Sequence, residues 1–234
     1  MGSGQATCRE LKRLLSLSIM RAMNQGELRR TVNAYGVGAD VYTRNGEASS
    51  RDWFNEPRAR FIEHLRPDAL VLDLGCGPGL EMGDLLQAGC RPVGLDPTPQ
   101  FAAIAQQRLP TCPVLLGTAT TLPFRDGSLD GVWASASLLH VARAAVAGAL
   151  AEIRRTMRSN APFYSSVQRG DREGRVPGNA LGEHLVWYTY FEPGEWFGLI
   201  REAGFQVRWQ LVTEDLLNVN EGATGWINVV ATAV

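Results

Sequence analysis

The chain of 234 residues contains almost no lysine, and its charges nearly cancel. Lys12 is the only lysine, so arginine supplies the rest of the positive charge, and the formal net charge is -1 at pH 7. A balanced chain lacks the basic field that attracts nucleic acids and anionic membranes. The composition therefore speaks against both kinds of partner, and we interpret the arginine excess as compositional bias.

Cysteine, histidine and long apolar runs are also scarce. The four cysteines (Cys8, Cys76, Cys90 and Cys112) include no C-x-x-C pair, and none of the three histidines stands at metal-ligand spacing. This pattern is typical of reduced thiols in an intracellular protein and predicts no metal site. No apolar run approaches the roughly 18 residues of a membrane span, and no signal-peptide pattern opens the chain. We expect a cytoplasmic protein.

Hydrophobic residues make up 45% of the chain, enough for one sizeable core. From residue 69 onwards, short apolar runs typical of buried strands alternate with helical patterns. The expected strands cover residues 69–74, 91–95, 112–116, 129–134, 162–167, 205–212 and 225–234. This rhythm predicts an α/β fold with a mostly parallel seven-stranded sheet, helices on both faces and an antiparallel C-terminal strand. The last two strands are expected to form a closing hairpin that adds this antiparallel element to the sheet edge.

Two segments fall outside this rhythm. Residues 1–50 form an N-terminal extension, in which Leu11 to Arg30 predicts an amphipathic helix that packs on the domain or on a second copy in a homodimer. Thr31 to Ser50, with Tyr35 and Tyr42, is either a lid or a plain loop. Residues 51–234 form one domain, whose insertion at about 168–192 is either a cover over the substrate or a packed hairpin.

Three glycines after the first strand predict a ligand site. Gly75, Gly77 and Gly79 lead from a buried strand into a helix, and such a turn lets a ligand approach the backbone. A dinucleotide fingerprint would need glycine where Leu80 stands. Asp96 lies 21 positions after Gly75 and suits the ribose hydroxyls of any adenosine-type ligand.

Asp73 discriminates between such ligands. A carboxylate two residues before Gly75 would repel a pyrophosphate but would attract an ammonium group. S-adenosylmethionine carries a ribose, an adenine and an amino-acid cation, so it fits both aspartates. A nicotinamide-dependent reductase is disfavoured for the same reason.

Four motifs in order carry a family resemblance. They are Asp73-Leu-Gly-Cys-Gly-Pro-Gly79, Gly94-Leu-Asp-Pro97, the run from Leu122 to Val132, and Ala134-Ser-Ala-Ser-Leu-Leu-His-Val141. Together they resemble the class I S-adenosylmethionine-dependent methyltransferases, in particular the small single-domain bacterial type related to quinone-biosynthesis enzymes. The resemblance implies the Rossmann-like methyltransferase fold, with S-adenosylhomocysteine as the product of the cofactor.

Position by position, the resemblance implies a set of cofactor residues. The methionine end would be held by Asp73 and by the backbone of Gly75, Cys76, Gly77 and Gly79. Asp96 would hold the ribose, Pro97 would lie against the adenine, and Ser135 would contact the cofactor's amino group. Thr118 stands where the family usually has aspartate, so the adenine contact is weaker or is made by the Ala119 backbone.

The side facing the methyl acceptor is less defined. The resemblance places Tyr42 at the lid over the methyl end, and Tyr35 belongs to the same segment. His140 is the first candidate for a polar group facing the acceptor, although a histidine before a helix often only caps it, and His184 is the second. Arg169, Trp187, Tyr188 and Tyr190 are candidates for the cover, with packing as the alternative role of each aromatic ring.

These residues predict methyl transfer from S-adenosylmethionine to a small-molecule acceptor by in-line displacement. Three alternatives remain open. The first is an RNA methyltransferase, for which the chain shows no basic face. The second is a protein methyltransferase. The third is a non-catalytic protein that keeps the fold, and Thr118 is its only support.

Overall fold

The computed structural model describes residues 26–49, 52–178, 181, 184–214 and 220–234. Helical residues 26–37 come first. The helices that follow are α2 (Ala39–Ala48), η1 (Asp52–Phe54), α3 (Asn55–Ile62), α4 (Leu80–Gln87), α5 (Pro99–Arg108), η2 (Leu138–His140), α6 (Arg143–Thr156) and α7 (Pro193–Glu202). The strands are β1 (Leu70–Leu74), β2 (Arg91–Asp96), β3 (Val114–Leu116), β4 (Gly131–Ala134), β5 (Pro162–Arg169), β6 (Glu173–Pro177), β7 (Leu185–Thr189), β8 (Phe205–Thr213) and β9 (Gly225–Ala233).

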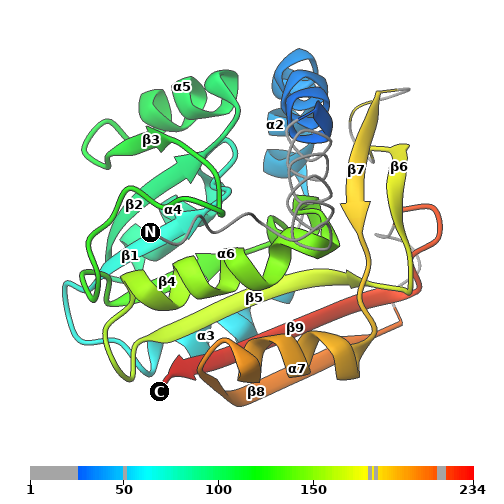
Figure 1. Ribbon diagram of the computed structural model, residues 1–234. Coiled ribbons are helices and arrows are strands. Elements are labelled where there is room, and N and C mark those ends of the chain that lie inside the picture. Colours follow the sequence, from blue (N-terminus) through cyan, green and yellow to red (C-terminus); the bar gives the residue numbers. More distant parts are fainter. Residues whose placement is uncertain (1–25, 50–51, 179–180, 182–183, 215–219) are drawn as a thin grey trace, which may run out of the picture.

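Seven of the strands form one twisted sheet in the order β3-β2-β1-β4-β5-β9-β8 (Figure 1). The five strands from β3 to β5 pair in parallel, whereas β9 is antiparallel to both β5 and β8. The predicted α/β fold is therefore confirmed. The closing hairpin adds its antiparallel strands at the sheet edge as expected, with β8 outermost and β9 paired with both β5 and β8. The inner position of β9 agrees with its burial, since nearly every residue of β9 is buried.

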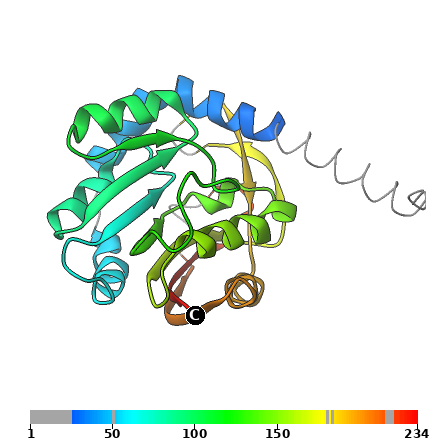
Figure 2. The ribbon, with the colours of Figure 1, turned by 60° about the vertical axis from the view of Figure 1, so that its left-hand side comes forward.

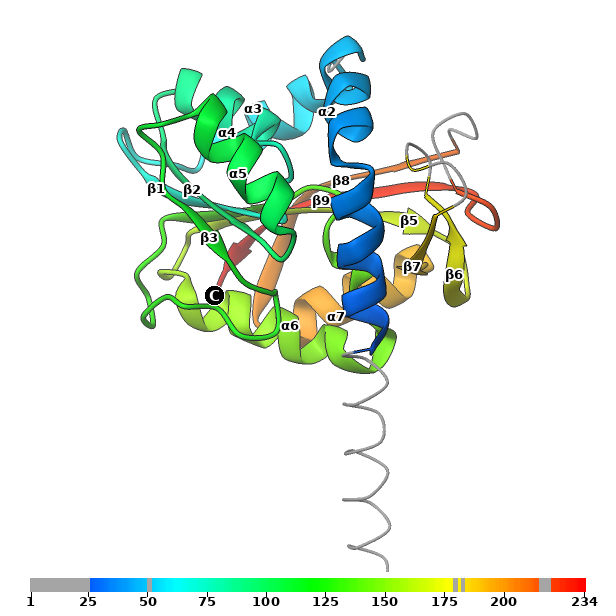
Figure 3. The ribbon, with the colours of Figure 1, turned by 90° about the horizontal axis from the view of Figure 1, so that it is seen from above.

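Helices cover both faces of this sheet (Figure 3). On one face, Phe61 of α3 and Leu85 of α4 pack against Trp133 and Tyr164 from neighbouring strands. On the other face, α6 and α7 supply apolar side chains to the larger core, among them Leu150 and Trp196. Since ligands of open parallel sheets bind at the carboxyl ends of the strands, this layering leaves that end for a site.

The segment Thr31 to Ser50 is helical through Ala48, so its interpretation as a loop is wrong. Its glycines obscured the pattern, but two of them serve close packing. A Cβ at Gly38 would lie 2.4 Å from Leu181 Cδ2, and one at Gly36 would lie 2.8 Å from Gln100 Oε1. Tertiary packing therefore overrides the weak helix propensity of the segment. The helices cross the carboxyl end of the parallel strands (Figures 1 and 3).

The insertion at about 168–192 contains an antiparallel hairpin of β6 and β7. The hairpin lies beside the first helical residues (Figure 2). Arg175 on β6 makes two hydrogen bonds of 2.5 Å to the carboxylate of Glu27, and the Trp187 amide donates to Thr31 Oγ1 at 3.0 Å. The N-terminal helix and the hairpin thus form one joined cover over the end of the sheet.

One expectation concerns a segment that is largely not described. Most of the predicted amphipathic helix from Leu11 to Arg30 lies outside the described residues, of which 26–30 are helical. Within the described ranges, no helix combines the length and apolar character that crossing a membrane requires.

Candidate functional site

The glycine turn after β1 has the backbone geometry that the sequence predicted. Gly75 and Gly79 have φ angles of +75° and +82°, which residues other than glycine rarely adopt. A Cβ at Gly75 would lie 2.4 Å from Ser137 Cβ, and one at Gly79 would lie 3.0 Å from Ala105 Cβ on α5. The first glycine therefore lets two loops meet at the end of the sheet, and the second lets α4 pack on α5.

Two buried carboxylates flank this turn. Asp73 lies near the end of β1 and is 2% exposed, and Asp96 ends β2 and is 5% exposed. Asp96 accepts hydrogen bonds from the Gly77 amide at 2.9 Å and from the Thr98 amide at 2.7 Å. Burial raises the pKa of Asp96, and the two amide hydrogen bonds oppose that rise. The turn and the second strand end are thus held together by a carboxylate.

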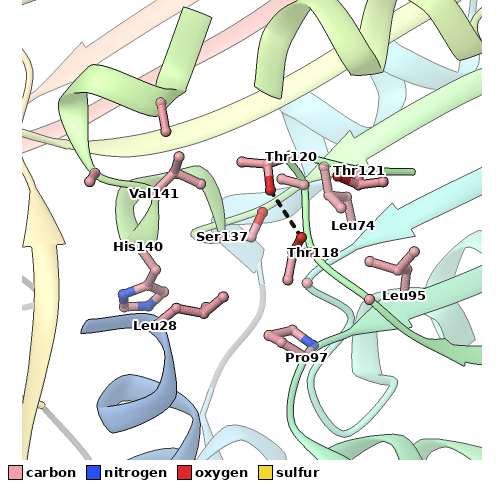
Figure 4. Close-up of a pocket in the computed structure, with 15 residues that line it drawn as sticks. Leu28, Leu74, Leu95, Pro97, Thr118, Thr120, Thr121, Ser137, His140 and Val141 are labelled. Atoms are coloured by element: carbon pink, nitrogen blue, oxygen red, sulfur yellow. Dashed lines mark hydrogen bonds between the residues drawn. The ribbon is translucent and has the colours of Figure 1, made fainter. Parts of the chain in front are cut away.

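A cavity of about 560 Å³ opens beside the turn, at the carboxyl ends of β1, β2, β3 and β4 (Figure 4). Its volume lies within the range of roughly 300 to 1,000 Å³ usual for small-ligand sites. Four residues assigned to the cofactor line it, namely Gly75, Pro97, Thr118 and Ala119. Thr118 Oγ1 lies 3.1 Å from Thr120 Oγ1, so a pair of hydroxyls occupies the place of the family's usual aspartate.

Other residues assigned to the cofactor lie behind the wall of this cavity. The side chain of Cys76 points into the core near Met82, and burial raises the pKa of its thiol. Asp73, Asp96, Gly77 and Gly79 are not among the residues that line the cavity.

Ser137 lines the cavity in place of Ser135. The backbone between them turns sharply, because Ala136 has a φ of +47° and its amide donates to Ser166 Oγ at 2.8 Å. A non-glycine residue in this conformation is uncommon and is typical of functional sites. This reversal brings Ser137 against Gly75, and one sequence shows no pattern for it.

Several further lining residues escaped sequence reasoning. Leu28 reaches the cavity from the N-terminal helix, close to Pro97 and His140 (Figure 4). The sequence could not identify Leu28 as a lining residue, because one leucine in an amphipathic helix does not indicate which part of the protein it contacts. The others come from strand ends, the loop after β3 and the start of α6: Leu74, Leu95, Gly117, Thr120, Thr121, Val141, Ala142 and Ala145.

A second, smaller cavity of about 150 Å³ adjoins the first. It is lined by three of the predicted acceptor-side residues, Tyr35, Tyr42 and Tyr188. The other lining residues are Ala136, Leu139, Gln168, Leu181, Asn220 and Trp226. His140 lines both cavities. We refer to the larger space as the cofactor cavity and to the smaller one as the acceptor chamber.

The hydrogen bonds of His140 define its tautomer. Nδ1 lies 2.7 Å from the Trp187 carbonyl oxygen, which only accepts, so Nδ1 carries the proton. Nε2 lies 2.9 Å from Tyr35 Oη and therefore accepts from that hydroxyl. Desolvation lowers the pKa of His140 to about 4, against a smaller opposing effect of the Trp187 carbonyl. Burial raises the pKa of Tyr35 well above its usual value, so both groups are uncharged at neutral pH.

Four predicted acceptor-side residues line neither cavity. Arg169 faces Glu192 and Glu214, with N to O distances of 3.7 and 3.5 Å. The Tyr190 hydroxyl donates to the Glu221 carbonyl, and the Trp187 indole donates to Thr189 Oγ1. His184 is exposed beside the hairpin turn. Trp187 acts through its backbone, by holding His140.

Comparison with known proteins agrees with this geometry. A family model described as a methyltransferase domain matches residues 72–164. An uncharacterised methyltransferase of Mycobacterium bovis is 33% identical over 145 residues, which cover 61% of this chain and 49% of the relative. A demethylmenaquinone methyltransferase of Beutenbergia cavernae is 41% identical over 93 residues, which cover 40% of this chain and 38% of that protein. The chain spans less than half the length of these two curated relatives.

Among solved structures, the 1,6-didemethyltoxoflavin-N1-methyltransferase of Burkholderia thailandensis shares the fold, with a TM-score of 0.65 and 21% identity over 100% of this chain and 93% of that chain. That protein was solved with 1,6-didemethyltoxoflavin and S-adenosylhomocysteine. The matched domain, the strand order and the glycine turn with its two aspartates agree with one another. Residues 72–164 of this chain match a methyltransferase domain, and the fold is shared with a solved methyltransferase.

Proposed function

We propose that this protein transfers a methyl group from S-adenosylmethionine to a small-molecule acceptor. One observation carries the proposal: the cofactor cavity and the acceptor chamber meet at His140, which lines both. A donor in the first space and an acceptor in the second would face each other across this residue. A chamber of about 150 Å³ suits a small molecule better than a nucleic acid or a protein segment.

The similar proteins support the acceptor class. One relative is a demethylmenaquinone methyltransferase, and one structural neighbour holds 1,6-didemethyltoxoflavin, which is a small molecule. The near-neutral net charge of -1 gives no support to the RNA methyltransferase alternative.

Different residues of this chain would bind different parts of the cofactor. Asp96 would accept hydrogen bonds from the ribose hydroxyls, and Asp73 would balance the charge of the amino group. Pro97 and Leu28 would enclose the adenosyl part, and Thr118 would accept one hydrogen bond from the adenine amino group. When bound, the cofactor supplies a methyl group on a sulfonium, which reacts without metal or covalent catalysis.

Alignment and exclusion of water are then the main tasks of the protein. The joined cover of the N-terminal helix and the β6–β7 hairpin closes over the site, while Tyr35 and His140 supply the polar groups nearest the acceptor. A proton released by an acceptor hydroxyl or amine would pass to Tyr35 Oη as the Tyr35 proton moves to His140 Nε2. Because the pKa of His140 is about 4, this pair is a weak base and suits an acceptor that is itself acidic.

Isothermal titration calorimetry tests the proposed cofactor directly. We expect S-adenosylhomocysteine to bind one site per chain and to raise the melting temperature. Dinucleotides should do neither. Stabilisation by a dinucleotide but not by S-adenosylhomocysteine would overturn the proposal and would favour a nicotinamide-dependent reductase instead.

A further inference from the structure

None of the described residues that line the acceptor chamber carries a formal charge. The ten lining residues are four aromatic residues, three aliphatic ones, two amides and His140. His140 is neutral, because its folded-state pKa lies near 4, and burial raises the pKa values of Tyr35 and Tyr188. At neutral pH the chamber therefore offers hydrogen bonds but no compensating charge.

The ion pairs of Arg169 and Arg175 lie outside the chamber lining. Arg169 faces Glu192 and Glu214, Arg175 binds Glu27, and none of the five lines the chamber. An ion that entered a space lined by uncharged groups would lose hydration without gaining a partner of opposite charge. The described lining thus gives an ion of either sign no side chain of opposite charge.

The aromatic walls are held in fixed positions. The rings of Tyr35 and Tyr42 meet edge to face with centroids 5.6 Å apart, and both contact Phe101 of α5 at 5.8 and 5.2 Å. The ring of Tyr188 lies 4.8 Å from that of His140. Rigid rings with these edge and face contacts favour a flat partner, since offset stacking and edge-to-face packing are the preferred aromatic geometries.

One end of the chamber is polar without being charged. Gln168 on β5 is 1% exposed and Asn220 is 4% exposed, and Asn220 Nδ2 donates to Gln168 Oε1 at 3.0 Å. Asn220 Oδ1 is buried without a hydrogen-bond partner among the described residues, so it can accept one from a ligand. Buried polar groups need partners, so an acceptor that carries an N–H, an O–H or a carbonyl gains from binding beside this pair.

From these observations we propose that the methyl acceptor is an uncharged, planar one- or two-ring molecule that hydrogen-bonds to the Gln168–Asn220 pair. The inference rests on the proposed function, because it assigns the chamber to the acceptor. The chamber volume of about 150 Å³ sets the size, since it is below the roughly 300 Å³ at which typical ligand pockets begin.

The test uses three probes that share shape and differ in charge: 3-hydroxybenzamide, 3-hydroxybenzoate and 3-hydroxybenzylamine. Each is titrated by ligand-observed NMR at pH 7.5 into the full chain saturated with S-adenosylhomocysteine. We expect the neutral amide to bind at least about tenfold more tightly than the anion or the cation. Equal or tighter binding of a charged probe, or binding of none of the three, would overturn the inference.

A matched pair of variants locates the effect. Gln168→Glu keeps an acceptor for the Asn220 Nδ2 hydrogen bond but adds a negative charge to the chamber, so the preference should move toward the cationic probe. Gln210→Glu adds the same charge at an exposed position on β8 and should leave the order of the probes unchanged. An unchanged order in Gln168→Glu would place the probes outside the chamber and contradict the inference.

Calorimetry with S-adenosylhomocysteine separates the two possible failures. If the wild-type chain does not bind S-adenosylhomocysteine, the proposed function fails. If it binds S-adenosylhomocysteine but shows no preference for the neutral probe, only the assignment of the acceptor class fails.

Discussion

The cofactor cavity and the acceptor chamber adjoin each other, yet the chain builds them differently. Apart from Leu28, the cofactor cavity is lined by residues at the carboxyl ends of consecutive parallel strands and in the loops that follow them. The chamber takes Ala136, Leu139 and His140 from the segment after β4. Its other residues come from the N-terminal helices, β5, the β6–β7 hairpin and the segment from Asn220 to Trp226. Parallel strands bring their ends to one edge by topology alone, whereas the chamber depends on how appended segments pack. The first region is therefore the more predictable, and the second is where specificity can vary.

The largest expected effect concerns the glycine turn. Gly75→Ala forces a side chain into a φ of +75° and brings a Cβ within 2.4 Å of Ser137 Cβ. Strain and overpacking together should destabilise the fold by about 3 kcal/mol or more and abolish binding of S-adenosylhomocysteine. Urea unfolding and calorimetry measure both.

Gly83→Ala is the matched control for the turn. Gly83 lies within α4, and a Cβ there would meet nothing within 4 Å. This change should stabilise the helix by roughly 0.5 to 1 kcal/mol. If Gly75→Ala behaved like Gly83→Ala, the turn would not need glycine.

The second effect is a pH dependence of stability that arises from His140 at the border of the two regions. Its folded-state pKa of about 4 lies below the ordinary 6.5, so between these values the unfolded chain binds more protons than the folded chain. The stability that neutral His140 contributes is fully present above pH 6.5 and is lost as the pH falls toward 4. This is a change of about 3 kcal/mol in the free energy of unfolding.

Urea unfolding of wild type and His140→Gln between pH 4 and pH 7 measures this effect. The free energy of unfolding should rise more steeply with pH in the wild type than in His140→Gln. His64→Gln changes an exposed histidine after α3 and serves as the control. Equal slopes for wild type and His140→Gln would show that His140 titrates normally in the folded protein.

The third effect separates the regions by ligand. Asp96→Ala should weaken binding of S-adenosylhomocysteine by about ten- to a hundredfold, since hydrogen bonds to a charged group contribute roughly 1.5 to 3 kcal/mol. Asp96 also holds the Gly77 and Thr98 amides, so some stability should be lost as well. Asp126→Ala, at a side chain that is 81% exposed, should change neither quantity. Unchanged affinity in Asp96→Ala would remove the proposed ribose site.

The smallest effect concerns the hydroxyl pair beside the proposed adenine position. Thr118→Asp restores the carboxylate usual in the family and should tighten binding of S-adenosylhomocysteine by about fivefold, the difference between a neutral and a charge-assisted hydrogen bond. Thr111→Asp adds the same charge in an exposed loop and should have no effect. Weaker binding in Thr118→Asp would mean that the adenine lies elsewhere.

Sequence reasoning predicted the strands from apolar runs and the cofactor turn from Gly75, Asp73 and Asp96, because each feature is local in the chain. It did not point to Ser137, because the backbone reversal at Ala136 is held by Ser166, a residue 30 positions away. It also left the role of residues 31–50 open, because their glycines are explained only by contacts with Leu181 and Gln100.

The sequence by itself thus determined the fold class and the cofactor, since alternating apolar runs and a glycine-rich strand end leave few other solutions. Only the tertiary structure decided that Tyr35 bonds to His140, that Trp187 contributes its carbonyl oxygen, and that Gln168 meets Asn220. The physical reason is distance along the chain. These pairs are separated by 105, 47 and 52 positions, and no local pattern records which buried polar groups will satisfy one another.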